Sequence, residues 1–101
     1  MIIYSITTSV KNEHVDDWLK WMQDEHIPNI MKTGYFENYK IYKVRVPTTN
    51  SEESTYIINY ECESFEKYKQ YADTEAARLR ANYAAKYSGI AKTARTVIES
   101  L

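Results

Sequence analysis

Hydrophobic and polar residues alternate with a period of two along four segments of the chain, over residues 2–10, 36–46, 55–62 and 90–101. These segments are rich in β-branched and aromatic residues, and such alternation predicts strands that bury one face. Between the first two segments, and after the third, apolar residues instead recur every three to four positions, which predicts helices. The expected order of elements is therefore β-α-β-β-α-β.

The first predicted helix begins at Glu13, with Asn12 as its N-cap. At about 100° per residue, one side of this helix carries an apolar stripe that we expect to face the sheet. The stripe consists of Val15, Leu19, Met22, His26 and Ile30. Trp18 lies at the edge of the stripe and is expected in the core.

Pro28 is expected to interrupt this helix. A proline has no backbone N–H, and its ring disfavours helical geometry at the preceding residue, here Ile27. We therefore predict a break or kink within a residue or two of Ile27, followed by a short helical piece over residues 28–32. Gly34 then provides a stop signal.

The second helical region follows the third strand, with Ser64 as its N-cap and Gly89 as its stop. Asp73 and Thr74 predict a break within it, and Thr74 is expected to cap a second helix. Between the second and third strands, Pro47 and the polar residues 48–54 predict a hairpin loop.

Two right-handed crossovers in this order place the helices on one face of a four-stranded antiparallel sheet. The sequence therefore predicts an α+β, ferredoxin-like fold, with residues 1–101 as a single domain and no internal boundary. We expect the uncovered face to be half apolar, and such a face is unfavourable in water over four strands. Its expected members are Ile3, Ser5, Thr7, Ile57, Asn59, Arg95 and Val97. Packing of two sheets face to face predicts a homodimer, in which Glu61 or Glu99 of the second copy pairs with Arg95.

Composition narrows the classes of function. The net charge of −1 gives no electrostatic case for nucleic acid or for an anionic membrane. No apolar run approaches the roughly 20 residues of a membrane span, and the first residues lack the pattern of a signal peptide. Cys62 is the one cysteine, so no internal disulfide is possible and the cytoplasm is the expected compartment.

The block from Trp18 to Pro28, Trp-x-x-Trp-Met-x-x-Glu-His-Ile-Pro, carries a resemblance that extends over essentially the whole chain. The chain resembles a family of small uncharacterised bacterial proteins, a domain of unknown function within the dimeric α/β-barrel superfamily. That resemblance implies a ferredoxin-like subunit, a homodimer whose two sheets close into a barrel, and no assigned reaction. The His-Ile-Pro segment is also similar to the His-x-Pro feature of cofactor-free quinone-forming monooxygenases, ethyl-tert-butyl-ether-degradation-type proteins and NIPSNAP-type proteins.

His26 is the candidate catalytic residue, because an imidazole beside a helix end and Glu25 can move protons at neutral pH. The alternative is a packing residue whose ring bonds a carbonyl freed by Pro28. Candidate ligand-binding residues are Trp18, His26, Tyr4 and Tyr39, the tyrosines being drawn from ten in the chain against two phenylalanines.

No metal site and no cofactor are expected: His14 and His26 are twelve residues apart, Cys62 has no CxxC neighbour, and there is no Gly-rich phosphate loop. Two functions remain open. One is a non-catalytic or structural module, with a small organic molecule bound between the first helix and the sheet. The other is a cofactor-independent, monooxygenase-like enzyme that acts on a small aromatic substrate, with His26 as proton shuttle.

Overall fold

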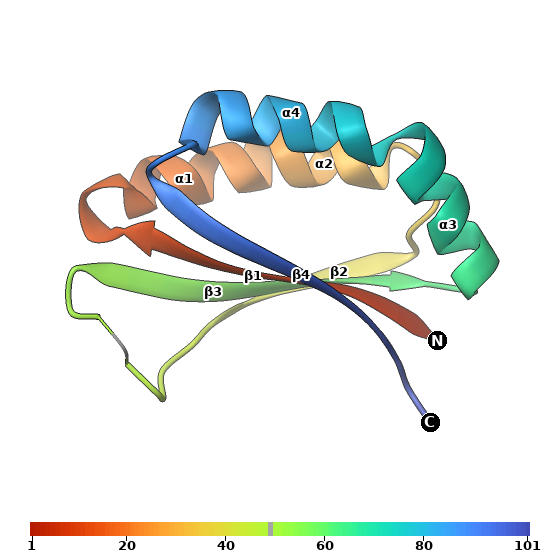
Figure 1. Cartoon of the computed structure of the whole chain (residues 1–101), viewed down its shortest axis with the longest axis horizontal. Coiled ribbons are helices and arrows are strands. Elements are labelled where there is room, and N and C mark those ends of the chain that lie inside the picture. The colour runs from red at the N-terminus through yellow and green to blue at the C-terminus, as the bar shows by residue number, and fades with distance from the viewer. Residues whose placement is uncertain (49) are drawn as a thin grey trace.

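The computed structural model describes residues 1–48 and 50–101, and its elements follow the predicted order (Figure 1). The strands are β1 (Ile2–Lys11), β2 (Asn38–Lys43), β3 (Glu53–Cys62) and β4 (Ala91–Glu99). The helices are a 3-10 turn η1 (Asn12–His14), then α1 (Val15–Trp21), a π-helical segment η2 (Met22–His26), α2 (Ile27–Met31), α3 (Phe65–Thr74) and α4 (Ala76–Tyr87). No helix in the described part of the chain is long and apolar enough to cross a membrane.

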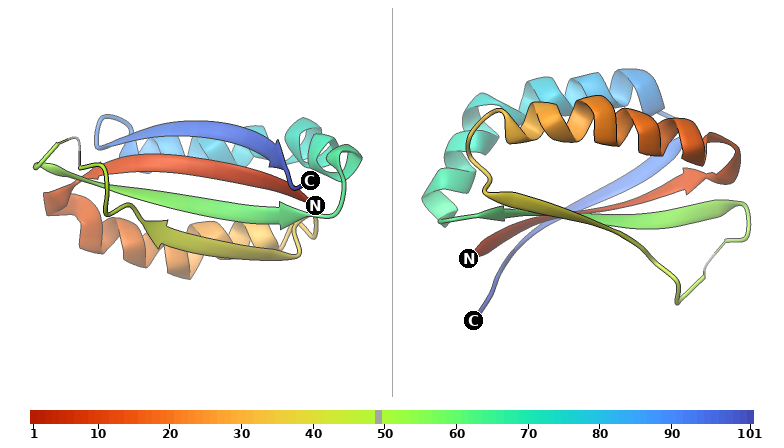
Figure 2. Two further views of the ribbon diagram at one scale, coloured as in Figure 1. Left: turned by 90° about the horizontal axis from the view of Figure 1, so that it is seen from below. Right: turned by 180° about the vertical axis from the view of Figure 1, so that it is seen from behind.

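The four strands form one antiparallel sheet in the order β2-β3-β1-β4. Both helical regions lie on the same face of this sheet, and the other face is bare (Figures 1 and 2). The α+β, ferredoxin-like prediction is therefore confirmed. The two terminal strands, β1 and β4, pair with each other, so the ends of the chain lie close together.

The core occupies the space between the sheet and the helices. Alternate residues of β1 and β3 point into it, and the alternation along both strands matches the predicted period of two. Several of its largest fully buried side chains are aromatic: Tyr4, Trp18, Tyr60 and Tyr71. A core this rich in tyrosine contains hydroxyl groups that need partners. The Tyr4 hydroxyl has one, whereas the Tyr60 hydroxyl has none within the described residues.

The first helical region does not break at Pro28. Ile27 keeps α-helical geometry (φ −61°, ψ −46°), so the expectation that it would leave that geometry is wrong. Instead the hydrogen bonding widens to a π-helix over η2, and Pro28 occupies the first turn of α2, where its missing N–H does little harm. The disturbance ends at His26, within the predicted distance of Ile27, but the helical path continues.

Two predicted caps are also wrong. The side chain of Asn12 does not cap a helix; its Nδ2 donates to the Ser51 carbonyl (2.9 Å) and its Oδ1 accepts from Ser54 Oγ (2.7 Å). The hydroxyl of Thr74 donates back to the Gln70 carbonyl (2.6 Å), which is a common alternative for a threonine at a helix end.

Two further signals are confirmed. Ser64 caps α3, with Lys67 N donating to its Oγ at 3.2 Å. Gly34 and Gly89 both stop helices with positive φ, at 82° and 80°.

The register of β4 corrects the predicted sheet faces. Arg95 pairs with Ile6, and Val97 pairs with Tyr4, so both point toward the helices rather than onto the bare face. The carboxylate partner expected for Arg95 across a dimer is therefore not required. The bare face instead carries Ile98 beside Ile3.

Candidate functional site

A buried hydroxyl cluster lies where α1, α4, β1 and β4 meet. Trp18 Nε1 donates to the Tyr83 hydroxyl at 3.1 Å, and that hydroxyl lies 3.2 Å from Thr8 Oγ1. Thr8 Oγ1 lies in turn 3.1 Å from Thr93 Oγ1, on the neighbouring strand. Trp18, Thr8 and Tyr83 are all buried, so these polar groups satisfy one another inside an apolar core.

His26 reaches this cluster from the end of the π-helical segment. It is buried, as predicted, with 7% of its surface exposed. Its ring stacks on Trp21, with centroids 4.9 Å apart and planes 18° apart, and lies 5.4 Å from the Tyr83 ring. Among the described residues, no hydrogen bond of the His26 ring is found.

The electrostatics of His26 differ from the expectation. Burial, and to a smaller degree the positive charge of Arg95, lower the pKa of His26 from 6.5 to about 4. The favourable helix-end dipole does not act, because the helical path continues through α2 beyond His26. The imidazole is therefore neutral at neutral pH and serves as a hydrogen-bonding group rather than as a base poised near pH 7.

A small cavity of about 20 Å³ lies between His26 and the sheet. Its lining is Ile6, Thr8, Trp18, Met22, His26, Ile58, Tyr83, Thr93 and Arg95. A wider groove of about 300 Å³ lies between α4 and β4 and shares Tyr83, Thr93 and Arg95 with the cavity. The groove and the cavity therefore adjoin at these three residues. Arg80 also lines the groove, so two arginines border it.

The four predicted ligand-binding residues fall into two groups. Trp18 and His26 line the cavity together. Tyr4 is buried in a second aromatic cluster, where its ring lies 6.0 Å from that of Tyr60 and its hydroxyl accepts from Arg80 Nη2 at 3.2 Å. Tyr39, on the edge strand β2, lies beside Tyr60 of β3, and 37% of the Tyr39 surface is exposed.

Sequence reasoning missed three residues that complete the cavity, namely Thr8, Thr93 and Arg95. The two threonines have no distinctive signal, because each is one of several polar residues on a strand. They meet only because the register of β1 and β4 pairs Thr8 with Thr93. Tyr83 lies on the buried face of α4.

Metal-ligating side chains do not gather in the described part of the chain: no group of three or more His, Cys, Asp or Glu residues is placed to hold an ion. Cys62 is buried and free, and its Sγ contacts the Tyr35 carbonyl at 3.2 Å.

The fold is that of a ferredoxin-like α+β protein. The chain belongs to the family described as "Domain of unknown function (DUF4286)", whose sequence profile matches residues 1–101. The predicted family relationship is therefore confirmed. No sequence among the curated proteins matches the chain.

Solved structures show the fold at low sequence identity. An uncharacterised NIPSNAP domain protein from Burkholderia xenovorans matches with a TM-score of 0.74 and 14% identity, over 100% of this chain and 95% of that one. A dimeric ferredoxin-like protein from an uncultured marine organism matches with a TM-score of 0.70 and 13% identity, over 100% and 95%. An antibiotic biosynthesis monooxygenase matches with a TM-score of 0.63 and 13% identity, over 100% and 99%.

Proposed function

We propose that this protein is a homodimeric small-molecule-binding module whose ligand enters between α4 and β4 and meets His26. The observation that carries the proposal is the neutral imidazole of His26 beside a cavity that also contains the Tyr83 and Thr8 hydroxyls. A cavity with an apolar lining and a few convergent polar groups is the usual form of a ligand site.

The charges along the approach favour an anionic ligand. Arg80 and Arg95 line the α4–β4 groove, and among the described residues no carboxylate lines either the groove or the cavity. Guanidinium groups bind carboxylates and phenolates through charge-assisted hydrogen bonds. The Tyr83 ring, which lines the groove, favours a flat ligand. A small aromatic acid or phenol fits both features.

Size decides how such a ligand sits. The inner cavity of about 20 Å³ has room for little more than a water molecule. The outer groove of about 300 Å³ is large enough for a single aromatic ring. We therefore place the ring in the groove, with one polar substituent directed through the shared residues toward His26.

The test is a titration of the protein with 4-hydroxybenzoate and, separately, with the uncharged benzyl alcohol, followed by protein NMR. We expect saturable shifts of the Tyr83 and Thr93 resonances with 4-hydroxybenzoate and weaker binding in His26→Gln. If His26 only packs, His26→Gln costs about 1–3 kcal/mol of stability through a misplaced polar group and leaves binding unchanged. His14→Gln is the matched control, since His14 lies outside both cavity and groove.

The alternative is a cofactor-independent enzyme that oxidises a small aromatic substrate, with His26 as the proton acceptor. The likeness of fold to an antibiotic biosynthesis monooxygenase supports this alternative, as does the aromatic lining of the cavity. The low pKa of His26 makes the imidazole a weak acceptor at neutral pH, which favours binding over catalysis. Oxygen uptake with hydroquinone as substrate tests it: uptake that His26→Gln abolishes supports catalysis, and uptake equal to the buffer blank contradicts it.

The homodimer rests on the bare face of the sheet. Ile3, Ile57 and Ile98 lie on that face, and 47% of the Ile98 surface is exposed in the single chain. The Oδ1 atom of Asn59, on the same face, is buried with no hydrogen-bond partner among the described residues. One neighbour of similar fold is a dimeric ferredoxin-like protein, and a second copy of this chain is the occupant that we propose.

A further inference from the structure

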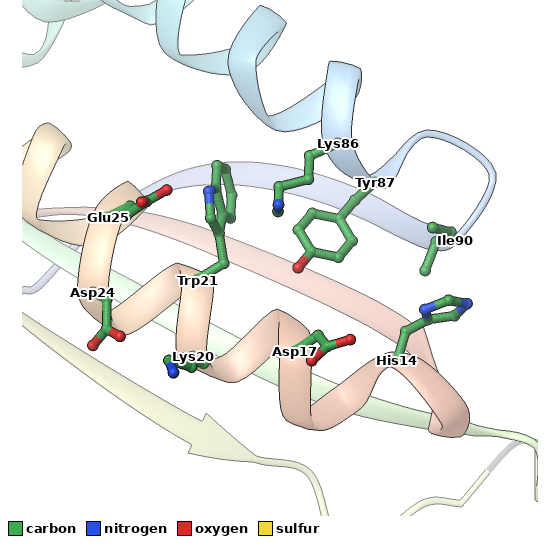
Figure 3. A pocket seen from close by; sticks show the side chains of 9 residues that line it. All are labelled: His14, Asp17, Lys20, Trp21, Asp24, Glu25, Lys86, Tyr87 and Ile90. Atoms are coloured by element: carbon green, nitrogen blue, oxygen red, sulfur yellow. The ribbon is translucent and has the colours of Figure 1, made fainter.

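A second groove, of about 400 Å³, separates the first helical region from α4 (Figure 3). It is lined by His14, Asp17, Lys20, Trp21, Asp24, Glu25, Lys86, Tyr87 and Ile90. None of these residues lines the cavity at His26. The second groove shares Tyr87 with the α4–β4 groove, but Trp21, Lys86 and the carboxylates that line it have no part in the proposed function.

Two aromatic rings form the centre of this groove. The Trp21 and Tyr87 rings lie 5.5 Å apart and at 55° to each other. The ammonium group of Lys86 lies over the Trp21 ring, with its Nζ 5.8 Å from the ring centroid. Figure 3 shows the Lys86 side chain directed into the space between the two rings. The Lys86 side chain, itself an alkylammonium ion, therefore makes a cation–π contact with the face of the Trp21 indole.

Two carboxylates border the same rings. Glu25 lies on the η2 side of Trp21, and Asp17 lies near Tyr87 (Figure 3). Burial raises the pKa of Tyr87, and the negative charge of Asp17 raises it further. Both side chains are exposed, and neither forms an ion pair within the part of the chain that the structure describes. In the same view Asp24 and Lys20 extend away from the Trp21 ring.

We propose that this groove binds a small organic cation, of the alkylammonium or quaternary ammonium class, over the Trp21 ring. The cation replaces the Lys86 ammonium, the Trp21 and Tyr87 rings enclose its alkyl groups, and Asp17 and Glu25 supply the opposite charge. Aromatic rings with carboxylates beside them recognise methylated ammonium groups because the negative face of each ring attracts the cation. The groove volume suits a small molecule of this kind.

The test uses choline as the probe and the indole N–H resonances of the protein as the readout. The chain has two tryptophans, and Trp18 donates its N–H inside the core, so it serves as an internal reference. We expect a saturable shift of the Trp21 resonance and little change at Trp18. The neutral isostere 3,3-dimethyl-1-butanol has the same shape without the charge, and we expect it to bind at least several-fold more weakly.

Variants separate the groove from general surface charge. Asp17→Asn combined with Glu25→Gln removes both carboxylates at exposed positions, and we expect choline to bind about three- to tenfold more weakly. Asp16→Asn is the matched control, because Asp16 is an exposed neighbour of Asp17 that does not line the groove. Lys86→Gln removes the ammonium group that lies over the Trp21 ring, and we expect this variant to bind choline more tightly.

Three results overturn the proposal: no saturable shift at Trp21, equal affinity for the neutral isostere, or an equal loss in Asp16→Asn. This groove shares Tyr87 with the α4–β4 groove, and Trp21 stacks on His26. The two titrations are therefore told apart by their readouts, which are the Trp21 resonance for choline and the Thr93 resonance for 4-hydroxybenzoate.

Discussion

The indole nitrogen of Trp18 and the hydroxyl of Tyr83, 65 residues apart in the chain, lie 3.1 Å apart inside the core. Through this hydrogen bond the first helical region is fixed to α4, and Thr8 connects the same hydroxyl to the sheet. The Tyr83 hydroxyl oxygen therefore connects α1, α4 and the inner strand β1. The cavity beside His26 has its shape because these elements converge on that atom.

Replacement of Tyr83 by phenylalanine tests this convergence. Tyr83→Phe leaves the buried Trp18 N–H without an acceptor and Thr8 with one partner fewer, so we expect a loss of about 1–3 kcal/mol in the free energy of unfolding. Tyr87→Phe is the control, since no hydrogen bond of the Tyr87 hydroxyl is found among the described residues, and it should cost much less. Urea unfolding at one fixed protomer concentration measures both. Equal losses in the two variants would contradict the role assigned to the Tyr83 hydroxyl.

The low pKa of His26 predicts acid sensitivity. The unfolded chain takes up a proton at His26 near pH 6.5, whereas the folded chain does so only near pH 4. Between these values the unfolded state binds more protons, so stability falls as the pH falls from about 6.5 to about 4. A separation of this size corresponds to about 3 kcal/mol.

Unfolding curves at pH 7.0 and pH 4.5 check this. We expect His26→Gln to lose clearly less stability than the wild type between the two values, while His14→Gln loses as much as the wild type. A wild-type protein whose stability does not change over this interval would show that His26 titrates normally.

Arg95 contributes to the same shift through its charge, although burial contributes more. Arg95→Gln should therefore raise the pKa of His26 part of the way toward 6.5. An NMR titration of the His26 ring protons measures it directly. Arg80→Gln is the matched variant, because the Arg80 guanidinium donates to the Tyr4 hydroxyl instead, and it should leave the His26 titration in place.

The bare sheet face predicts the state of assembly. Light scattering at micromolar concentration should give a mass near twice 11.9 kDa. Ile57→Lys places a charge in the centre of that face and should yield monomers, since an unpaired buried charge is costly. Ala77→Lys, at an exposed position of α4, should remain dimeric. A monomeric wild-type protein would contradict the proposed dimer, in which two sheets close into a barrel.

The strands and the burial of His26 were predictable because each hydrophobic pattern fits only one type of secondary structure. Residues 2–10 place every large apolar side chain but Ile3 on one face, which fixes the orientation of β1. In β4 the two possible faces carry one large aliphatic residue each, Val97 and Ile98, so hydrophobicity alone does not decide between them. Only pairing with β1 directs Arg95 toward the helices, and the prediction chose the wrong face.

The composition of the site was less predictable for a related reason. Tyr4 and Thr8 face the same side of β1, yet four residues of strand separate them by roughly 13 Å. A pattern of period two shows which side a residue faces, but not what lies above it. That depends on where α4 crosses the sheet, and the crossing places Tyr83 over Thr8.

The π-helical segment η2 has a consequence at the level of single codons. A π-helical turn holds one residue more than the α-helical turn it replaces. Deletion of one residue between Met22 and His26 would restore α-helical bonding and rotate everything before it by about 100° relative to everything after it. Trp18 and His26 would then no longer face the sheet together. Insertion or deletion of a single codon in this segment is therefore enough to place the His26 imidazole at the cavity or to remove it.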